Sequence, residues 1–143
     1  LQPLSIMKIR RLNFCNRIDG FGAISVFPIS DFNAGQPLLL YAEIENHRSE
    51  LTADGRYRSV FAAMIEFYRE GSSEPIASRT IQLPEIEDLC AAERTDYFQS
   101  YELTVPSLSP GKYTLHLRVR DQLSQQTATT ALSFEIRPLD RGQ

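Results

Sequence analysis

The residues that would mark a nucleophilic active site are few in this sequence. Only two histidines occur, His47 in a polar stretch and His116 in a segment of alternating polarity. A serine nucleophile needs a base that a third group holds in place, and no serine lies in a Gly-x-Ser-x-Gly turn. We therefore expect no catalytic residues and predict that the chain is not an enzyme. A hydrolase with a site of another kind is the weakest alternative.

The acidic residues are the next candidates, for paired-carboxylate chemistry or for cation binding. Glu43 and Glu45 lie on one side of an alternating segment, about 7 Å apart by the rise of a strand, and Glu85, Glu87 and Asp88 form a local cluster. Glycoside hydrolysis needs two carboxylates across a cleft, and the Asp-x-Asp-x-Asp-Gly calcium loop is missing. We interpret these acids as a solvated or salt-bridged surface and predict no metal site and no cofactor.

The two cysteines, Cys15 and Cys90, do not form a Cys-x-x-Cys pair that would indicate zinc or redox chemistry. We interpret them as free thiols packed as small hydrophobic groups. The alternative is one disulfide between the N-terminal segment and a later acidic loop, which would require an oxidising compartment. The sequence does not fix the compartment, and we favour an extracytoplasmic or membrane-associated parent protein.

Composition narrows the class of protein. A chain of 143 residues with 42% hydrophobic and 23% charged residues suits one domain. The formal net charge is −3, whereas a general nucleic-acid-binding domain usually carries a basic excess, so we expect no nucleic-acid partner. The acidic excess is concentrated in residues 43–102, at −7, and is interpreted as solvated loops. No apolar run approaches the roughly 20 residues of a membrane helix, so we expect no direct membrane insertion.

Apolar residues recur with a period of two along most of the chain, which is typical of half-buried strands. Residues 85–96 break this pattern and are expected to form a loop with one helical turn, while a helix remains an alternative for 58–69. The sequence predicts an all-β, antiparallel sandwich of about eight strands, with short connections. We expect one domain over 1–143, with an N-terminal strand extension (1–30) and a frayed tail (138–143), and a fragment of a longer protein. The expected strands are residues 7–14, 23–29, 38–46, 58–69, 76–83, 97–105, 112–121 and 128–136.

One motif has a specific counterpart in known sandwiches. The run Leu108-Ser109-Pro110-Gly111-Lys112-Tyr113 resembles the tyrosine corner of immunoglobulin-like and fibronectin type III domains. The resemblance implies an immunoglobulin-like sandwich with a structural corner: Leu108 closes the end of the core, Pro110 and Gly111 form the turn, and the Tyr113 hydroxyl binds upstream backbone. The Cys-Trp-Cys signature of antibody domains is absent, because the chain has no Trp.

A second likeness covers most of the chain. The segments 13–15, 20–22, 32–46 and 94–98 resemble a β-rich region of an uncharacterised family of bacterial proteins, in which it is one part of a longer chain. The family has no established activity, so the resemblance implies architecture only.

A candidate interaction face follows from the expected strand order. If strands 58–69, 112–121 and 128–136 are neighbours, as in a fibronectin-like order, their outward side chains collect on one surface. Its apolar stripe flanked by Arg and Tyr is typical of a protein-binding patch. In the alternative, the N-terminal strands cover Val60, Ala62 and Met64. The face comprises Val60, Ala62, Met64, Tyr68, His116, Arg118 and Arg120.

These observations favour a non-catalytic accessory module of a larger bacterial protein. Its expected partners are other domains of the parent protein or another protein, and the oligomeric state is left open. The alternative is a carbohydrate- or ligand-binding module that uses Tyr41, Tyr68 or Tyr101 as an aromatic platform.

Overall fold

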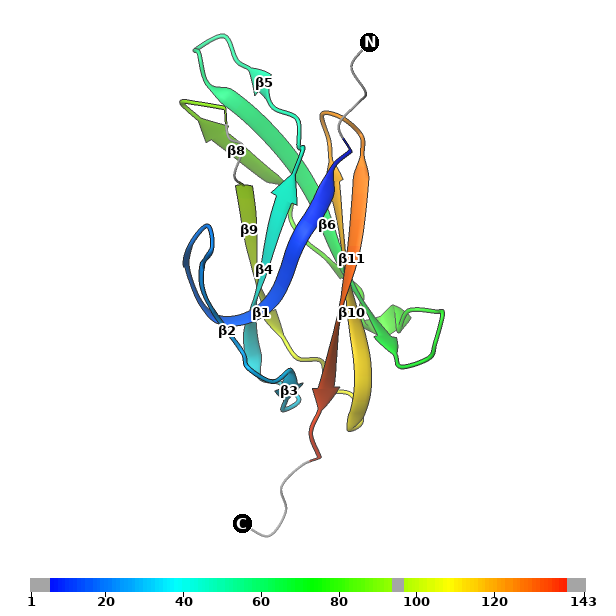
Figure 1. Cartoon of the computed structure of the whole chain (residues 1–143). Coiled ribbons are helices and arrows are strands. Elements are labelled where there is room, and N and C mark those ends of the chain that lie inside the picture. The colour runs from blue at the N-terminus through cyan, green and yellow to red at the C-terminus, as the bar shows by residue number, and fades with distance from the viewer. Residues whose placement is uncertain (1–5, 94–96, 139–143) are drawn as a thin grey trace.

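The computed structural model describes residues 6–93 and 97–138 and consists almost entirely of strands (Figure 1). The segments expected to be strands at 7–14, 38–46, 58–69, 97–105, 112–121 and 128–136 all form strands, and the helix alternative for 58–69 is excluded. The elements are β1 (Lys8–Gly20), β2 (Ala23–Val26), β3 (Asp31–Phe32), β4 (Pro37–Glu45), β5 (Glu50–Leu51), β6 (Tyr57–Arg69), the 3-10 helix η1 (Ala77–Arg79), β7 (Ile81–Gln82), β8 (Ile86–Cys90), β9 (Tyr97–Thr104), β10 (Gly111–Asp121) and β11 (Thr127–Ile136).

The strands form two layers. The four-stranded sheet, sheet A, has the order β2-β1-β4-β9, and the second, sheet B, has the order β3-β11-β10-β6-β5, with β7 and β8 also paired to β6. Every pairing is antiparallel except that of β11 with β3. The strands β1, β4 and β9 of sheet A face β6, β10 and β11 of sheet B across the core. The fold is therefore an all-β antiparallel sandwich, as the alternation predicts.

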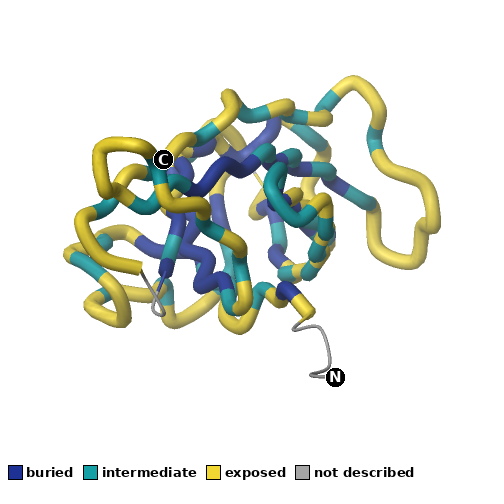
Figure 2. The backbone as a smooth tube through the Cα atoms, turned by 90° about the horizontal axis from the view of Figure 1, so that it is seen from above, coloured by how far each residue is buried: buried dark blue, intermediate teal, exposed yellow. Residues whose placement is uncertain are grey.

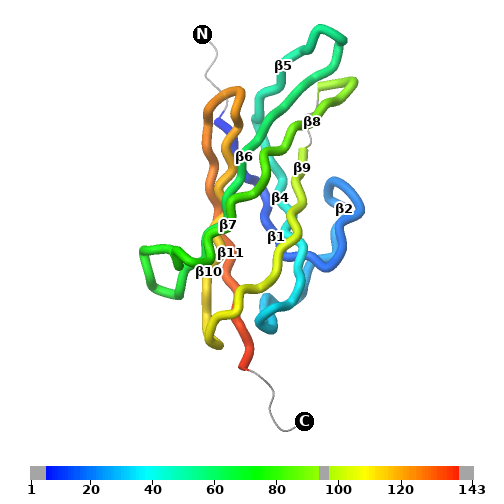
Figure 3. Tube along the Cα trace, turned by 180° about the vertical axis from the view of Figure 1, so that it is seen from behind, coloured from blue at the N-terminus to red at the C-terminus, as the bar shows by residue number. Residues whose placement is uncertain are grey.

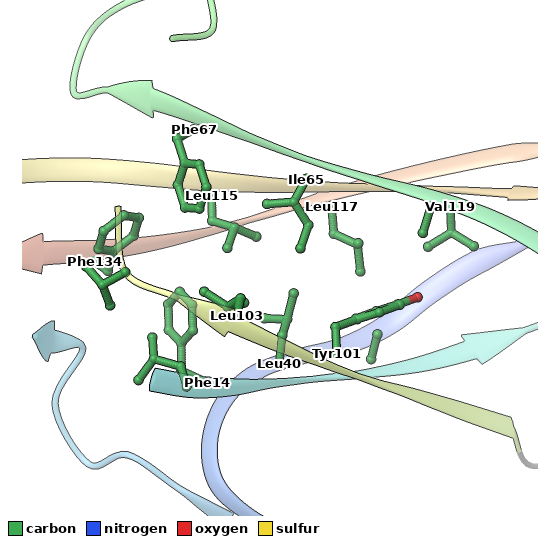
Figure 4. Close-up of a cluster of buried hydrophobic side chains, with 14 of the residues drawn as sticks. Phe14, Leu40, Ile65, Phe67, Tyr101, Leu103, Leu115, Leu117, Val119 and Phe134 are labelled. Atoms are coloured by element: carbon green, nitrogen blue, oxygen red, sulfur yellow. The ribbon is translucent and has the colours of Figure 1, made fainter. Parts of the chain in front are cut away.

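The core lies between the layers because each long strand directs every second side chain inward. Seen from above, the buried residues lie toward the middle of the molecule, and the outer loops are largely exposed (Figure 2). Figure 4 shows the inward side chains meeting across the gap. Sheet A contributes Phe14, Leu40, Tyr101 and Leu103, and sheet B contributes Ile65, Phe67, Leu115, Leu117, Val119 and Phe134.

The N-terminal segment is part of the sandwich itself. Over its first half β1 pairs with β4, from Lys8 opposite Glu45 to Cys15 opposite Leu39, and β2 then pairs with the end of β1. On the far side β1 lies beside β11, where the Met7 backbone N–H donates to Gln126 Oε1 at 2.8 Å. Residues 8–26 therefore supply two strands of sheet A.

Two expectations about the middle of the chain are wrong. Residues 76–83 form η1 and the two-residue β7 instead of one strand, and only Ile81 and Gln82 of this segment are in strand register with β6. Residues 86–90, expected in a loop, form β8 along the first part of β6. The partner strand overrides the weak local pattern: Arg58 on β6 binds Glu87 of β8 at 2.9 Å and stabilises an acidic strand.

We predict that truncating an inward side chain of β10 destabilises the sandwich. Leu117 is fully buried, and Leu117→Ala is expected to lower the free energy of unfolding by about 2–5 kcal/mol through lost burial and a cavity. Urea unfolding followed by circular dichroism measures this. Leu51→Ala is the matched control, since Leu51 is 64% exposed, and equal losses in both variants would contradict the assigned core.

Candidate functional site

The predicted interaction face lies on the outer side of sheet B. Strands β6 and β10 are neighbours, and their register sets the outward residues opposite one another in rows. The rows are Tyr68 with Thr114, Glu66 with His116, Met64 with Arg118 and Ala62 with Arg120. Directly opposite side chains of an antiparallel pair lie within contact distance. The structure therefore brings Ala62, Met64, Tyr68, His116, Arg118 and Arg120 together on one surface.

Within this face the side chains interact in pairs. The rings of Tyr68 and His116 lie 4.1 Å apart between centroids, and Arg118 Nη2 lies 3.5 Å from Glu66 Oε1. The Arg118 side chain is 47% exposed and that of Glu66 only 13%, so the arginine lies over the acid. The face thus presents an aromatic pair and a cation next to a methionine.

Coverage of the face differs between its two ends. Val60 is buried and pairs with Glu87 of β8, so it contributes little open surface. Met64, Tyr68 and His116 are partly exposed, and Arg118 is exposed. The described N-terminal strands β1 and β2 belong to sheet A in the other layer, and so they do not cover Ala62 or Met64.

The structural corner lies where the chain enters β10. The Tyr113 hydroxyl donates to the carbonyl oxygen of Ser109 at 2.6 Å, and the Tyr113 side chain is 4% exposed. Leu108 packs against the core, and Pro110 is exposed in the turn. Gly111 adopts φ 149°, a backbone conformation that residues with a Cβ rarely take. The corner thereby fixes the start of β10, the strand that carries half of the face.

We predict that Tyr113→Phe lowers the free energy of unfolding by about 1 kcal/mol, because the Ser109 carbonyl loses its donor while the ring stays in place. Thermal and urea unfolding measure the change. The matched control is Tyr68→Phe, because Tyr68 is partly exposed on the outer face of sheet B. An unchanged unfolding transition in Tyr113→Phe would count against the corner.

A buried polar cluster lies on the outer side of sheet A. Tyr41 and Glu43 point away from the core, yet they are 0% and 4% exposed. The β1–β2 hairpin folds over them: the Gly22 backbone N–H donates to the Tyr41 hydroxyl at 2.8 Å, and that hydroxyl donates to Glu43 Oε2 at 2.5 Å. Phe98 of β9 stacks on the Tyr41 ring at 5.5 Å. Sequence analysis expected the acids on a solvated or salt-bridged surface. Glu43 is salt-bridged, but it is buried under the hairpin and not solvated.

Two consecutive arginines of β1 neutralise this buried carboxylate. The pairing shifts between Ile9 opposite Ile44 and Arg11 opposite Glu43, so that Arg10 is an extra residue. Such a bulge re-aims a side chain. Arg10 Nη2 lies 2.5 Å from Glu43 Oε1, and Arg11 Nη1 lies 3.9 Å from Oε2. The sequence shows Arg10, Arg11 and Glu43, but it does not show the bulge that brings the arginines to the carboxylate.

The environment of Glu43 favours its charged form. Burial by itself raises the pKa of Glu43, but hydrogen bonds from Tyr41 and Arg10, together with the charges of Arg10 and Arg11, outweigh burial and hold the pKa below its usual value. A carboxylate whose pKa is lowered by folding stabilises the fold above its unfolded-state pKa, about 4.3, and this stabilisation is lost as the pH falls through the folded-state pKa.

We therefore predict that Glu43→Gln destabilises the protein most at pH 7, and that the gap to the wild-type protein narrows below about pH 4. Urea unfolding at pH 7, 5, 4 and 3 measures the gap. Glu45→Gln is the control, because Glu45 is 37% exposed and lies 3.4 Å from Arg10. A gap that does not change with pH would refute the role given to the charge.

The remaining candidate residues, Tyr41, Tyr101 and His47, pack against other side chains of the domain. Tyr41 and Tyr101 are at most 5% exposed, so of the proposed aromatic platforms only Tyr68 reaches the surface. His47 packs on the rings of Phe61 and Tyr97, with centroids 5.6 and 4.9 Å away. No three metal-ligating side chains converge within residues 6–93 and 97–138.

Other titratable groups are also accounted for. Cys15 and Cys90 are free thiols. Burial raises the pKa of the Cys15 thiol, which disfavours the nucleophilic thiolate. Asp121, which sequence analysis did not single out, is fully buried and accepts backbone N–H groups of Arg48 at 2.6 Å and Leu123 at 3.0 Å. It ties the β10–β11 turn to the loop after β4.

Comparison with known proteins identifies a shared fold and no family. No family model matches the chain, and no curated protein matches its sequence. A structural match is the β-glucuronidase of Bacteroides uniformis, with a TM-score of 0.53 and 13% identity, covering 93% of this chain and 14% of the enzyme. Two weaker matches have TM-scores below 0.5. The alkylpurine DNA glycosylase AlkC of Pseudomonas fluorescens has a TM-score of 0.46 and 15% identity, and the match covers 94% of this chain and 31% of that one. The sporulation control protein Spo0M of Bacillus subtilis has a TM-score of 0.45 and 4% identity, and the match covers 94% of this chain and 51% of that one.

The match to the glucuronidase shows the fold alone, and this chain spans about one seventh of the length of that enzyme. Across the described part of the chain, no helix is long and apolar enough to cross a membrane.

Proposed function

We propose that this chain is a non-catalytic interaction module of a larger bacterial protein, and that the outer face of sheet B contacts another domain of that protein or another protein. The observation that carries the proposal is the gathering of Met64, Tyr68, His116 and Arg118 on two adjacent central strands. Tyr, Met and Arg are enriched at protein interfaces, because they combine a large contact area with a polar or charged end.

We further propose that the module is related to immunoglobulin-like and fibronectin type III domains. Two features support this relationship: the order of the central strands, and the bond from the Tyr113 hydroxyl to the Ser109 carbonyl at the start of β10. The face of β6 and β10 carries the partly exposed aromatic side chains of Tyr68 and His116.

The second candidate function, carbohydrate binding, rests on the Tyr68–His116 pair alone. An aromatic ring that is open on one side can stack on a sugar, and the two ring centroids lie 4.1 Å apart on the partly exposed face. Micromolar binding on a glycan array that is lost in Tyr68→Ala would favour this candidate over protein contact.

Site-specific photo-crosslinking in the full-length protein tests the first candidate. A benzophenone amino acid replaces Arg118 on the proposed face, and a control replaces Ser100, which is exposed on β9 in sheet A. We expect one discrete product from position 118, identifiable by mass spectrometry, and none from position 100. Equal patterns from both positions, or no product from 118, would overturn the proposed face.

We also predict that Met64→Asp lowers the yield of the crosslinked product from position 118 without unfolding the domain. Met64 is partly exposed and lies directly opposite the exposed Arg118. The yield and the melting temperature are measured together. A domain that no longer folds with Met64→Asp would show that Met64 belongs to the core, and the face would then be rejected.

A further inference from the structure

The outer side of sheet B consists of three adjacent strips, and β6 forms the central strip. Its partly exposed outward side chains include Ala62 and Met64. β10 pairs with one edge of β6 and β8 with the other, because Phe61 pairs both with Asp121 of β10 and with Ile86 of β8. Seen from behind, β8 and the hairpin of β10 and β11 lie on opposite sides of β6 (Figure 3). The apolar central strip therefore has a different strand on each side.

The two outer strips carry opposite charges. On β10 the outward side chains include Arg118 and Arg120, which are both exposed. On the other edge of β6 the acids Glu85 and Glu87 are exposed, and Glu87 lies opposite Val60. Because alternate residues of a strand point to the same side, Glu85 shares the outer side of sheet B with Glu87. The apolar strip thus separates a basic strip from an acidic strip.

The charges of the outer strips are only partly satisfied within the chain. Arg118 Nη2 lies 3.5 Å from Glu66 Oε1. Arg120 Nε donates to Gln122 Oε1 at 3.0 Å, and Gln122 Nε2 donates to Glu85 Oε2 at 3.3 Å. Within residues 6–93 and 97–138, neither Arg120 nor Glu85 has an opposite charge within ion-pair distance. Both charges therefore remain available to a partner.

This order of strips is complementary to itself under two-fold symmetry. Two copies can face each other across a two-fold axis that runs along β6, and the apolar strips then meet at the axis. The axis exchanges the outer strips, so the basic strip of each copy faces the acidic strip of the other. Ala62 lies opposite Arg120, and the register from Phe61 opposite Ile86 places Glu85 beside Ala62 as well. Facing sheets pack about 10 Å apart, a gap that arginine and glutamate side chains span together.

The remaining charge near the axis and the size of the face are both compatible with such a contact. Arg58 of β6 is already held by Glu50 at 2.7 Å and by Glu87 at 2.9 Å. From residue 58 to residue 68, β6 spans roughly 34 Å, and three strands span roughly 14 Å. The contact would bury about 1,000 Å² in total, near the lower limit of specific interfaces, which indicates a weak dimer.

We infer that two copies of this chain associate through the outer face of sheet B, with Ala62 and Met64 near the two-fold axis and Arg120 of each copy paired with Glu85 of the other. The inference rests on the proposed interaction face and names a second copy of the chain as the protein that covers it. A second copy matches the face because both the basic and the acidic strip belong to this chain.

The test is sedimentation equilibrium of the chain at concentrations from about 10 μM to about 1 mM, where we expect a reversible monomer–dimer equilibrium. Arg120→Glu and Glu85→Arg each place like charges opposite each other in both halves of the dimer. Each variant alone is therefore expected to raise the dissociation constant at least about tenfold. An equimolar mixture of the two variants restores both pairs of opposite charges, and it is expected to associate as tightly as the wild-type chain.

Two controls make the same charge changes on sheet A. Arg17→Glu alters a residue of the β1–β2 hairpin that is 73% exposed, and Glu102→Arg alters an exposed residue of β9. Both should leave association unchanged. Circular dichroism checks the fold of each variant, and Arg120→Gln, which removes the charge without reversing it, replaces Arg120→Glu if that variant does not fold. Absence of association, unchanged association in the Arg120 variant, or no recovery in the mixture of folded variants would each overturn the inference.

Photo-crosslinking from position 118 in the full-length protein separates this inference from the proposed face. A product that joins two copies of the chain supports both. A discrete product with a different protein or domain supports the face and overturns the second copy as its partner. Absence of any product overturns both.

Discussion

Closure of two sheets over one apolar layer is the constraint on which the other features of this protein depend. Each long strand directs one set of side chains inward, and the inward sets of β4 and β10 are fully apolar apart from their ends. Burying them requires the strands to stay extended and in register, since a shift of one residue would turn the apolar set outward. The outward side chains are thereby fixed in rows, and the proposed interaction face consists of such rows on β6 and β10.

Polar interactions then hold the parts that the core does not reach. The hairpin of β1 and β2 is fixed by the Tyr41 hydroxyl and by Glu43, whose charge Arg10 and Arg11 balance. The turn after β10 is fixed by Asp121 in the same way. Glu43 pairs with Arg10 and is hydrogen-bonded, while Asp121 accepts backbone N–H groups of Arg48 and Leu123. Both buried acids therefore have hydrogen-bond partners, as burial of a polar group requires.

The surface for which we propose partner binding is the outer face of β6 and β10. Its Arg118 and Glu66 pair with each other, at 3.5 Å between Nη2 and Oε1. The aromatic pair of Tyr68 and His116 lies on the same face. A face built of side chains from two adjacent strands suits a protein partner, because contacts can form along both strands at once.

The sequence by itself determined the all-β class, the long strands and the row of outward residues on β6 and β10, because a period of two follows from strand geometry and needs no knowledge of neighbours. Only the tertiary structure decided that residues 86–90 are a strand and that Glu43 is buried. Each of these depends on contacts between segments far apart in the chain. The bulge at Arg10 and the folding of the hairpin over sheet A leave no periodic signal, so a single sequence cannot reveal them.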